Sequence, residues 1–296
     1  MNNKTSKNVL KINKKLAQKL IKNQFPKYAD LSICQVEKSG HDNRTFRLGD
    51  KMVIRLPSGK DYASQVEKEL FWLPKLKKYL SLSIPTSLAK GEPTVDYPFP
   101  WSINKWIEGD MANCSNVTDL NQFAVDLAGF LKELQAIATS EGPVAGEHNF
   151  YRGEDLVIYH EETKAALKNL KLLPTDKLND IWSIALESKW MKKKVWVHGD
   201  IAPGNLLVKN GKLCGVIDFG MLGVGDPSCD YAVAWTFFDK ESRKTFFEEL
   251  NCDEDTWKRA RGWALWKALI TYNEKGMTEN AKRAVNAILG DYEKTK

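Results

Sequence analysis

The chain has 296 residues, of which 43% are hydrophobic and 28% charged, a composition typical of globular proteins and not of disordered or fibrous ones. This length is sufficient for two domains of modest size. The formal net charge of +6 is small, and the lysines do not gather with aromatic residues as they do in a nucleic-acid-binding groove. No segment is apolar and long enough to span a bilayer, so we expect neither nucleic acid nor a membrane as a partner.

The five cysteines form no C-x-x-C pair and show no spacing typical of metal ligands. An odd number of scattered cysteines favours a reducing compartment. The first twenty residues also lack the apolar core and cleavage site of a signal peptide. We therefore predict a cytoplasmic protein, and we infer no obligate protein partner.

The N-terminal part of the chain predicts a small antiparallel sheet accompanied by helices. Its expected elements, in chain order, are a helix over 9–20, three short strands within 31–57, a helix over 64–76 and a strand over 101–107. Glycine-containing turns separate the three short strands. Pro26 follows the first helix, and Pro74 lies near the end of the second.

From residue 121 onward the helical period dominates and is interrupted by one hairpin. Helices are expected over 121–138, 155–170, 177–190, 240–249 and 256–274. Asn210-Gly211 is the favoured pair for a two-residue hairpin turn between short strands. A linker near Gly109 then separates a β-rich region, 1–108, from a helical region, 109–296. The predicted fold is α+β and bilobal, with a small antiparallel β lobe and a larger, mainly helical lobe.

Three polar side chains lie beside predicted strands within 197–220. Asp200 and Asn205 lie in a loop stiffened by proline, between two predicted strands. Asp218 follows the strand that pairs with the second of these in the hairpin, so the three side chains can converge on one point. Oxygen donors without nitrogen or sulfur ligands favour a hard cation such as Mg²⁺. With Asn205 and Asp218 as metal ligands, Asp200 remains as a general base toward an acceptor hydroxyl. Phosphoryl transfer requires this combination.

The order of these residues matches the kinase catalytic loop, in which H-R-D is followed by four residues, Asn and, further on, D-F-G. Here the motifs read His198-Gly199-Asp200, Asn205 and Asp218-Phe219-Gly220. With glycine in place of arginine, the loop resembles the aminoglycoside phosphotransferase family, whose relatives include choline kinases. The resemblance implies a protein-kinase-like fold and an ATP-dependent phosphotransferase, with GTP as an alternative donor and a small-molecule hydroxyl as the acceptor.

The residues around the loop extend this resemblance. Asp230 of the D-P-x-x-D stretch is expected to brace the loop backbone, and His198 to support the loop by hydrogen bonding instead of moving a proton. Only five residues separate Gly220 from Asp226, too few for the activation segment of a protein kinase, which favours a small acceptor. Ala202 stands where serine/threonine kinases carry a lysine near the γ-phosphate, so the source of that charge is unassigned.

The N-terminal region has no G-x-G-x-x-G motif, but a polar turn lies where the resemblance places the phosphate-covering loop. The candidate phosphate-binding residues there are Ser39, Gly40, His41, Asp42 and Asn43. Backbone N–H groups of such a turn can be directed at phosphate.

The third predicted strand carries Arg55 where kinases have their phosphate-binding lysine. The planar guanidinium keeps the charge and suits phosphate or carboxylate. Glu69 is its expected partner on the following helix, with Glu67 as the second choice. The resemblance further implies that the Lys105 carbonyl and the Ile107 N–H bind the adenine.

Three interpretations stay open from the sequence. Arg152 either contacts substrate or pins a loop, and Trp263 and Trp266 read as core more readily than as a substrate-stacking wall. The acidic stretch 239–257 is either a solvated helix face with an acidic helix N-terminus or the wall of a pocket for a cationic acceptor.

The acceptor itself also has alternatives. An aminoglycoside-like antibiotic is one candidate, and another metabolite such as choline, homoserine or a sugar is the other. A second class of function is a catalytically silent nucleotide-binding module. Arg55 favours that class, whereas the intact trio of Asp200, Asn205 and Asp218 argues against it.

Overall fold

The computed structural model describes residues 10–36, 42–170, 174–272 and 278–293. The chain divides into two compact units, one comprising Met1–Lys75 with Pro85–Ile107 and the other Leu76–Ile84 with Glu108–Lys296. Residues 76–84, which the predicted boundary assigns to the first region, group with the second unit. The reason is backbone pairing, since the Ser83 N–H donates to the Cys214 carbonyl and the Ser83 carbonyl accepts from the Val216 N–H.

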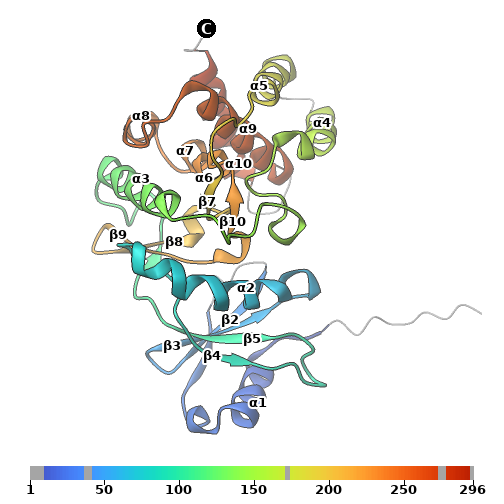
Figure 1. The fold of residues 1–296 in the computed structure, drawn as a ribbon, viewed down its shortest axis with the longest axis vertical. Helices are drawn as coiled ribbons and strands as arrows, with labels where there is room; N and C mark the ends of the chain where they lie inside the picture. The colour runs from blue at the N-terminus through green and yellow to red at the C-terminus, as the bar shows by residue number, and fades with distance from the viewer. Residues whose placement is uncertain (1–9, 37–41, 171–173, 273–277, 294–296) are drawn as a thin grey trace, which may run out of the picture. The chain divides into compact units, whose positions relative to one another are not determined.

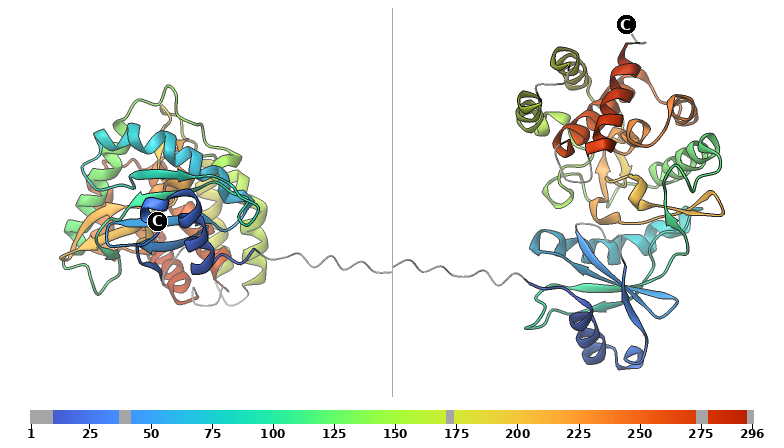
Figure 2. Two further views of the ribbon diagram at one scale, coloured as in Figure 1. Left: turned by 90° about the horizontal axis from the view of Figure 1, so that it is seen from below. Right: turned by 180° about the vertical axis from the view of Figure 1, so that it is seen from behind.

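The first unit contains a five-stranded antiparallel sheet in the order β1-β2-β3-β5-β4. Its elements are α1 (Lys14–Gln24), β1 (Ile33–Gln35), β2 (Asn43–Leu48), β3 (Met52–Pro57), α2 (Lys60–Leu76, whose last residue belongs to the second unit), β4 (Ser87–Gly91) and β5 (Trp101–Lys105). Helices α1 and α2 lie on opposite faces of the sheet (Figures 1 and 2). The helix α1 begins at Lys14 because the Asn13 side chain caps it.

The second unit is mainly helical, with two small sheets. Its helices are α3 (Leu120–Ala136), α4 (His160–Asn169), α5 (Thr175–Glu187), α6 (Ser228–Tyr231), α7 (Val233–Thr236), α8 (Lys240–Glu249), α9 (Glu254–Thr271) and α10 (Thr278–Tyr292). The strands β6 (Asp110–Met111), β8 (Leu206–Lys209) and β9 (Lys212–Val216) form one sheet, and β7 (Val195–Val197) pairs with β10 (Gly223–Gly225) in the other. Helix α9 packs against α4, α5, α6 and α10 (Figure 1).

The hairpin of β8 and β9 determines where the polar loop residues lie. Its turn consists of Asn210 and Gly211, both with positive φ (52° and 78°), as a type I′ hairpin turn requires. The predicted hairpin turn is therefore present. Asn205 immediately precedes the first strand, and Asp218 comes two residues after the second, so the hairpin brings both to one end of the pair.

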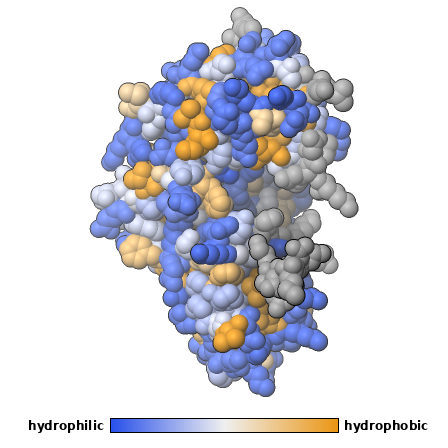
Figure 3. Space-filling model, turned by 90° about the vertical axis from the view of Figure 1, so that its right-hand side faces the viewer, coloured by the Kyte–Doolittle hydropathy of each residue, from blue (hydrophilic) through white to orange (hydrophobic). Residues whose placement is uncertain are grey.

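The helix over 240–249 has the predicted bounds, whereas β4, β6 and α10 were not predicted. The expected strand 101–107 ends at Lys105. In the described ranges, no helix combines the length and the apolar character needed to cross a membrane. The face drawn in Figure 3 carries hydrophilic side chains interrupted by smaller apolar areas.

Candidate active site

The loop after β7 is held from the protein interior by Asp230. Its Oδ2 accepts a hydrogen bond from the His198 N–H and its Oδ1 one from the Gly199 N–H, both at 2.7 Å. Asp230 is fully buried, and burial raises the pKa of its carboxyl to about 7, although the two N–H donors oppose this. These are the contacts expected of a residue that braces the loop.

His198 connects this loop to the segment that precedes Asp218. Its Nδ1 accepts from the Asp200 N–H at 3.2 Å, so Nε2 is the nitrogen that donates to the Ile217 carbonyl at 3.1 Å. Burial lowers the pKa of His198, against the opposing charges of Asp200 and Asp218. The imidazole is therefore neutral with both nitrogens engaged, as a loop-supporting role requires.

The glycine that replaces the arginine of H-R-D has a geometric cause. Gly199 has φ +84°, and a Cβ there would lie 2.4 Å from the Met221 carbonyl oxygen. The same carbonyl accepts from the Asn149 side chain at 3.2 Å, and Asn149 also donates to the Arg152 carbonyl. The 149–153 segment and the turn after Asp218 thus close around the loop and leave no room for a side chain at 199.

Asp200 has each carboxylate oxygen bound to a different partner. Oδ1 accepts from the Lys267 ammonium at 2.8 Å, and Oδ2 accepts from the Asn205 amide at 2.9 Å. Burial raises the pKa of Asp200, but the charge and the hydrogen bond of Lys267 outweigh burial and lower this pKa from 3.8 to about 2. The carboxylate is therefore ionised at neutral pH and oriented by both neighbours, which are the properties of a general base.

Sequence reasoning missed Lys267. It lies 67 positions after Asp200 in α9, a helix whose neighbouring residues are almost all buried. A lysine between Trp266 and Ala268 on such a helix was the one signal available, because lysine is rarely placed on a buried helix without a partner.

Asn205 and Asp218 lie next to the paired ends of β8 and β9. The Asn205 Nδ2 donates to both the backbone carbonyl and the carboxylate of Asp200, which turns its Oδ1 the other way as an acceptor. The Ile217 N–H donates to the Asn205 carbonyl at 2.9 Å. This backbone bond holds the residue before Asp218 next to Asn205. Asp218 has φ 67° and ψ 68°, a left-handed conformation that non-glycine residues adopt at a cost and that clusters at functional sites.

These two residues fit Mg²⁺ better than a softer metal. An amide oxygen and a carboxylate are hard donors, and Mg²⁺ is usually held by one or two such groups together with waters and phosphate oxygens. In the part of the chain that the structure describes, no group of three or more His, Cys, Asp or Glu could hold a metal ion. A protein-only cage of the zinc type is therefore not formed by the described residues.

Arg152 packs within its own unit. Its guanidinium donates to the Tyr159 hydroxyl at 2.8 Å and stacks 4.5 Å from the centre of the Trp266 ring. Trp263 and Trp266 are 2% and 5% exposed, as the core interpretation requires. These contacts favour the interpretation in which Arg152 pins the loop.

In the first unit, Arg55 and Glu69 form an ion pair. One guanidinium nitrogen of Arg55 lies 2.9 and 2.8 Å from the two carboxylate oxygens of Glu69, and the side chains are only 12% and 9% exposed. Glu67 instead pairs with Lys90. The expected pairing of the third-strand arginine with the following helix is present.

The other predicted nucleotide-binding residues lie as follows. Ser39, Gly40 and His41 lie outside the described residues. The Asp42 carbonyl accepts from the Ser58 N–H at 2.8 Å. Asn43 is 7% exposed and opens β2. Asp42 and Asn43 therefore lie where β2 begins, beside the end of β3, and their phosphate role stays a prediction.

The predicted adenine-binding groups lie at the end of β5. The Lys105 N–H donates to the Thr86 carbonyl at 2.8 Å, and Ile107 is the last residue of the first unit. Their contact with adenine likewise stays a prediction.

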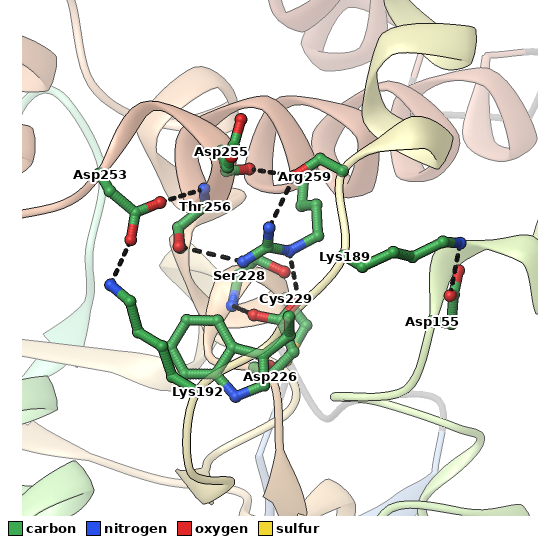
Figure 4. Close-up of polar contacts among 12 residues, drawn as sticks. Asp155, Lys189, Lys192, Asp226, Ser228, Cys229, Asp253, Asp255, Thr256 and Arg259 are labelled. Atoms are coloured by element: carbon green, nitrogen blue, oxygen red, sulfur yellow. Dashed lines mark hydrogen bonds and ion pairs between the residues drawn. The ribbon is translucent and has the colours of Figure 1, made fainter.

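The acidic stretch before α9 serves its own helices. Asp239 caps α8, and Asp253 caps α9 and pairs with Lys192 (Figure 4). Asp255 pairs with Lys258 at 3.1 Å. For these three residues the contacts match the interpretation as helix N-termini and a solvated face.

The first aspartate of D-P-x-x-D forms a buried ion pair with α9 (Figure 4). The Arg259 Nε lies 2.6 Å from the Asp226 Oδ2, and the side chains are 5% and 7% exposed. The same guanidinium donates to Ser188 and Thr256. The segment that follows D-F-G is therefore fixed to the helix that carries Lys267.

The chain has matches among known families and solved structures. Residues 33–263 match the phosphotransferase enzyme family. An aminoglycoside 2'-phosphotransferase-IIIa in complex with GDP aligns with TM-score 0.71 and 18% identity, over 96% of this chain and 100% of that one. APH(2")-IIa with streptomycin and ATP aligns with TM-score 0.58 and 20% identity, over 94% and 98%. The macrolide 2'-phosphotransferase MphH from Brachybacterium faecium aligns with TM-score 0.61 and 16% identity, over 93% and 97%.

No curated protein matches the chain. At these identities the solved structures establish the α+β kinase-like fold, with its N-terminal antiparallel sheet and helical C-terminal region. The family match covers most of the chain and includes all the residues around Asp200 except Lys267. The chain therefore belongs to the phosphotransferase enzyme family and is a phosphotransferase.

Proposed function

We propose that the protein transfers the terminal phosphoryl group of ATP to a hydroxyl of a small molecule, with Asp200 as the general base and Asn205 and Asp218 as the ligands of Mg²⁺. The observation that carries this proposal is the Asp200 carboxylate, ionised and bound on one oxygen by Asn205. GTP stays an alternative donor, because relatives were solved with GDP as well as with ATP.

In the proposed reaction, Asp200 orients the acceptor hydroxyl and takes its proton. The acceptor oxygen forms a bond to the γ-phosphorus while the bond from that phosphorus to the bridging oxygen breaks, and the nucleoside diphosphate leaves with the electron pair. The chemistry that Mg²⁺ supplies when bound is neutralisation of the charge on the phosphates. Asn205 has two tasks, because its amide nitrogen holds Asp200 while its amide oxygen is available to the metal.

Arg55 is proposed to orient the phosphates of the nucleotide. Its ion pair with Glu69 is the contact that kinases of this type use to position their phosphate-binding cation. Because arginine always carries its charge, the Arg55 side chain can fill this role without a lysine.

The acceptor is proposed to be a small hydroxylated molecule. Relatives with the same fold were solved with kanamycin and with gentamicin, and others are macrolide phosphotransferases. A coupled assay of ATP consumption should therefore compare aminoglycosides, macrolides, choline, homoserine and simple sugars. Stimulation by neutral or anionic acceptors alone would rule out an aminoglycoside while leaving the phosphotransferase assignment unchanged.

The division of roles is tested by two substitutions. Asp200→Asn should lower turnover by about 10² to 10⁴-fold and leave Mg-nucleotide affinity nearly unchanged, because it removes a base and not a ligand. Asp218→Ala should weaken Mg-nucleotide binding, measured by calorimetry. Asp255→Asn, a 68% exposed aspartate, is the control and should change neither quantity. Equal loss of nucleotide affinity in both site variants would contradict this division.

A further inference from the structure

The ammonium of Lys267 reaches the proposed base from a distant part of the chain. Its Nζ lies 2.8 Å from the Asp200 Oδ1, and the two side chains are 36% and 34% exposed. An ammonium has three N–H donors, and among the described residues Asp200 is the one to which it donates. Two donors therefore stay available to a ligand beside the carboxylate.

Helix α9 holds Lys267 in a fixed place. The buried pair of Arg259 with Asp226 anchors the helix eight residues earlier, a separation of about 12 Å along its axis. Gly262 packs so closely that a Cβ there would lie 2.5 Å from the Ala185 Cβ. Because both contacts lie in the interior, the position of Lys267 does not depend on a surface loop.

The catalytic loop itself offers no cation. From His198 to Asn205 it contains no lysine or arginine, and Ala202 occupies its middle. The transferring phosphoryl group spreads negative charge over three oxygens, and cations held beside it stabilise the transition state. A side-chain cation next to Asp200 therefore comes from another element, and α9 supplies one.

We propose that Lys267 donates hydrogen bonds to the transferring phosphoryl group while it holds Asp200, so that α9 provides the cation that the catalytic loop lacks. This inference rests on the proposed function, because it requires a nucleoside triphosphate as the donor. The diphosphate product lacks the phosphoryl group to which Lys267 donates. Lys267 should therefore contribute to the binding of the nucleoside triphosphate and not to that of the diphosphate. A lysine that only holds Asp200 in place would not distinguish them.

The test compares Lys267→Ala with Lys267→Arg and with Lys258→Ala, a lysine on the same helix that pairs with Asp255. Calorimetry with Mg²⁺ measures the affinity for the β,γ-imido analogue of ATP and for ADP. We expect Lys267→Ala to weaken analogue binding about tenfold, as loss of a charge-assisted hydrogen bond does, and ADP binding less than twofold. Turnover should fall about 100-fold. Lys267→Arg should recover most of the analogue affinity, and Lys258→Ala should match the wild type.

Two results would overturn this inference and leave the proposed function unchanged. One is an unchanged affinity of Lys267→Ala for the ATP analogue, and the other is an equal loss of affinity for the analogue and for ADP. If Lys267→Ala does not fold, Lys267→Gln and Lys267→Arg provide the same comparison, because both keep a long side chain at this position and only the arginine keeps the charge. A wild-type protein that binds neither nucleotide would instead overturn the proposed function.

Discussion

At the scale of single residues, Gly199 is constrained by both its backbone and its neighbours. Its φ is +84°, and a Cβ would lie 2.4 Å from the Met221 carbonyl oxygen. Gly199→Ala should therefore lower the free energy of unfolding by about 1–3 kcal/mol, the usual cost of a strained backbone residue, and should lower turnover by displacing Asp200. Urea unfolding and a steady-state assay measure the two effects.

Gly204 provides the matched control in the same loop. Apart from its two neighbours in the chain, no described residue has an atom within 4 Å of the position of a Cβ at Gly204. Gly204→Ala should therefore leave the free energy of unfolding within about 0.5 kcal/mol of the wild type, as surface substitutions usually do. Equal destabilisation by both alanines would show that the loop itself, and not the contact with Met221, requires glycine.

Asp230 gives a prediction about pH. Burial raises its pKa from 3.8 to about 7, so the folded chain binds the proton more tightly than the unfolded chain. The stability from this proton is complete below about pH 4 and is lost as the pH rises through about 7, at about 1.4 kcal/mol per unit of pKa difference. Asp230→Asn does not titrate. The stability of the wild type relative to this variant should therefore fall between pH 4 and pH 7, measured by urea unfolding.

A stability difference between Asp230→Asn and the wild type that is constant from pH 4 to pH 8 would contradict the raised pKa. Loss of stability in Asp230→Asn at every pH is a separate effect. It follows because an amide offers only one acceptor to the N–H groups of His198 and Gly199.

At the scale of elements, the sequence predicted several local patterns, and it missed strands that depend on distant contacts as well as one helix. The hairpin at Asn210-Gly211 was predictable because its turn is determined by two adjacent residues. Strand β4, Ser-Leu-Ala-Lys-Gly, has no β-branched residue and is a strand only because it pairs with β5. Helix α10 carried a usable signal, since Ala281, Val285 and Ile288 recur at helical spacing and are buried.

The candidate site divides in the same way. Asp200, Asn205 and Asp218 are predictable because the motif is short in sequence: Asp200 lies in the loop after β7, and Asn205 and Asp218 lie beside the paired ends of β8 and β9. Lys267 is not, because 67 positions separate it from Asp200 and only the packing of α9 brings them together.

The buried pair that anchors α9 gives the prediction for this element. Arg259→Ala leaves the Asp226 carboxylate buried without its cation and should lower the free energy of unfolding by about 3–5 kcal/mol. Asp226→Ala with Arg259→Ala should cost less than the sum of the single substitutions, because the unpaired charge is removed. Lys258→Ala, which breaks a surface pair on the same helix, should cost less than about 1 kcal/mol. Additive losses in the double variant would argue against a direct pair.

At the scale of the whole molecule, each unit contains a hydrophobic core of its own. The core cluster that includes Phe46, Ile54 and Trp101 lies entirely within the first unit. In the second unit, Val197 and Leu265 are both fully buried. Because core contacts determine which segments open together, damage to one core should act mainly on its own unit.

The substitution Ile54→Ala tests this independence. Ile54 is fully buried in β3, and its truncation should lower the stability of the first unit by about 2–5 kcal/mol. Native-state hydrogen exchange should then show loss of protection in β2, β3 and β5, while the amides of β7 and α9 keep theirs. Leu265→Ala is the matched control in the second unit and should give the reverse pattern. Equal loss of protection across both units in either variant would show instead that the two cores open as one cooperative structure.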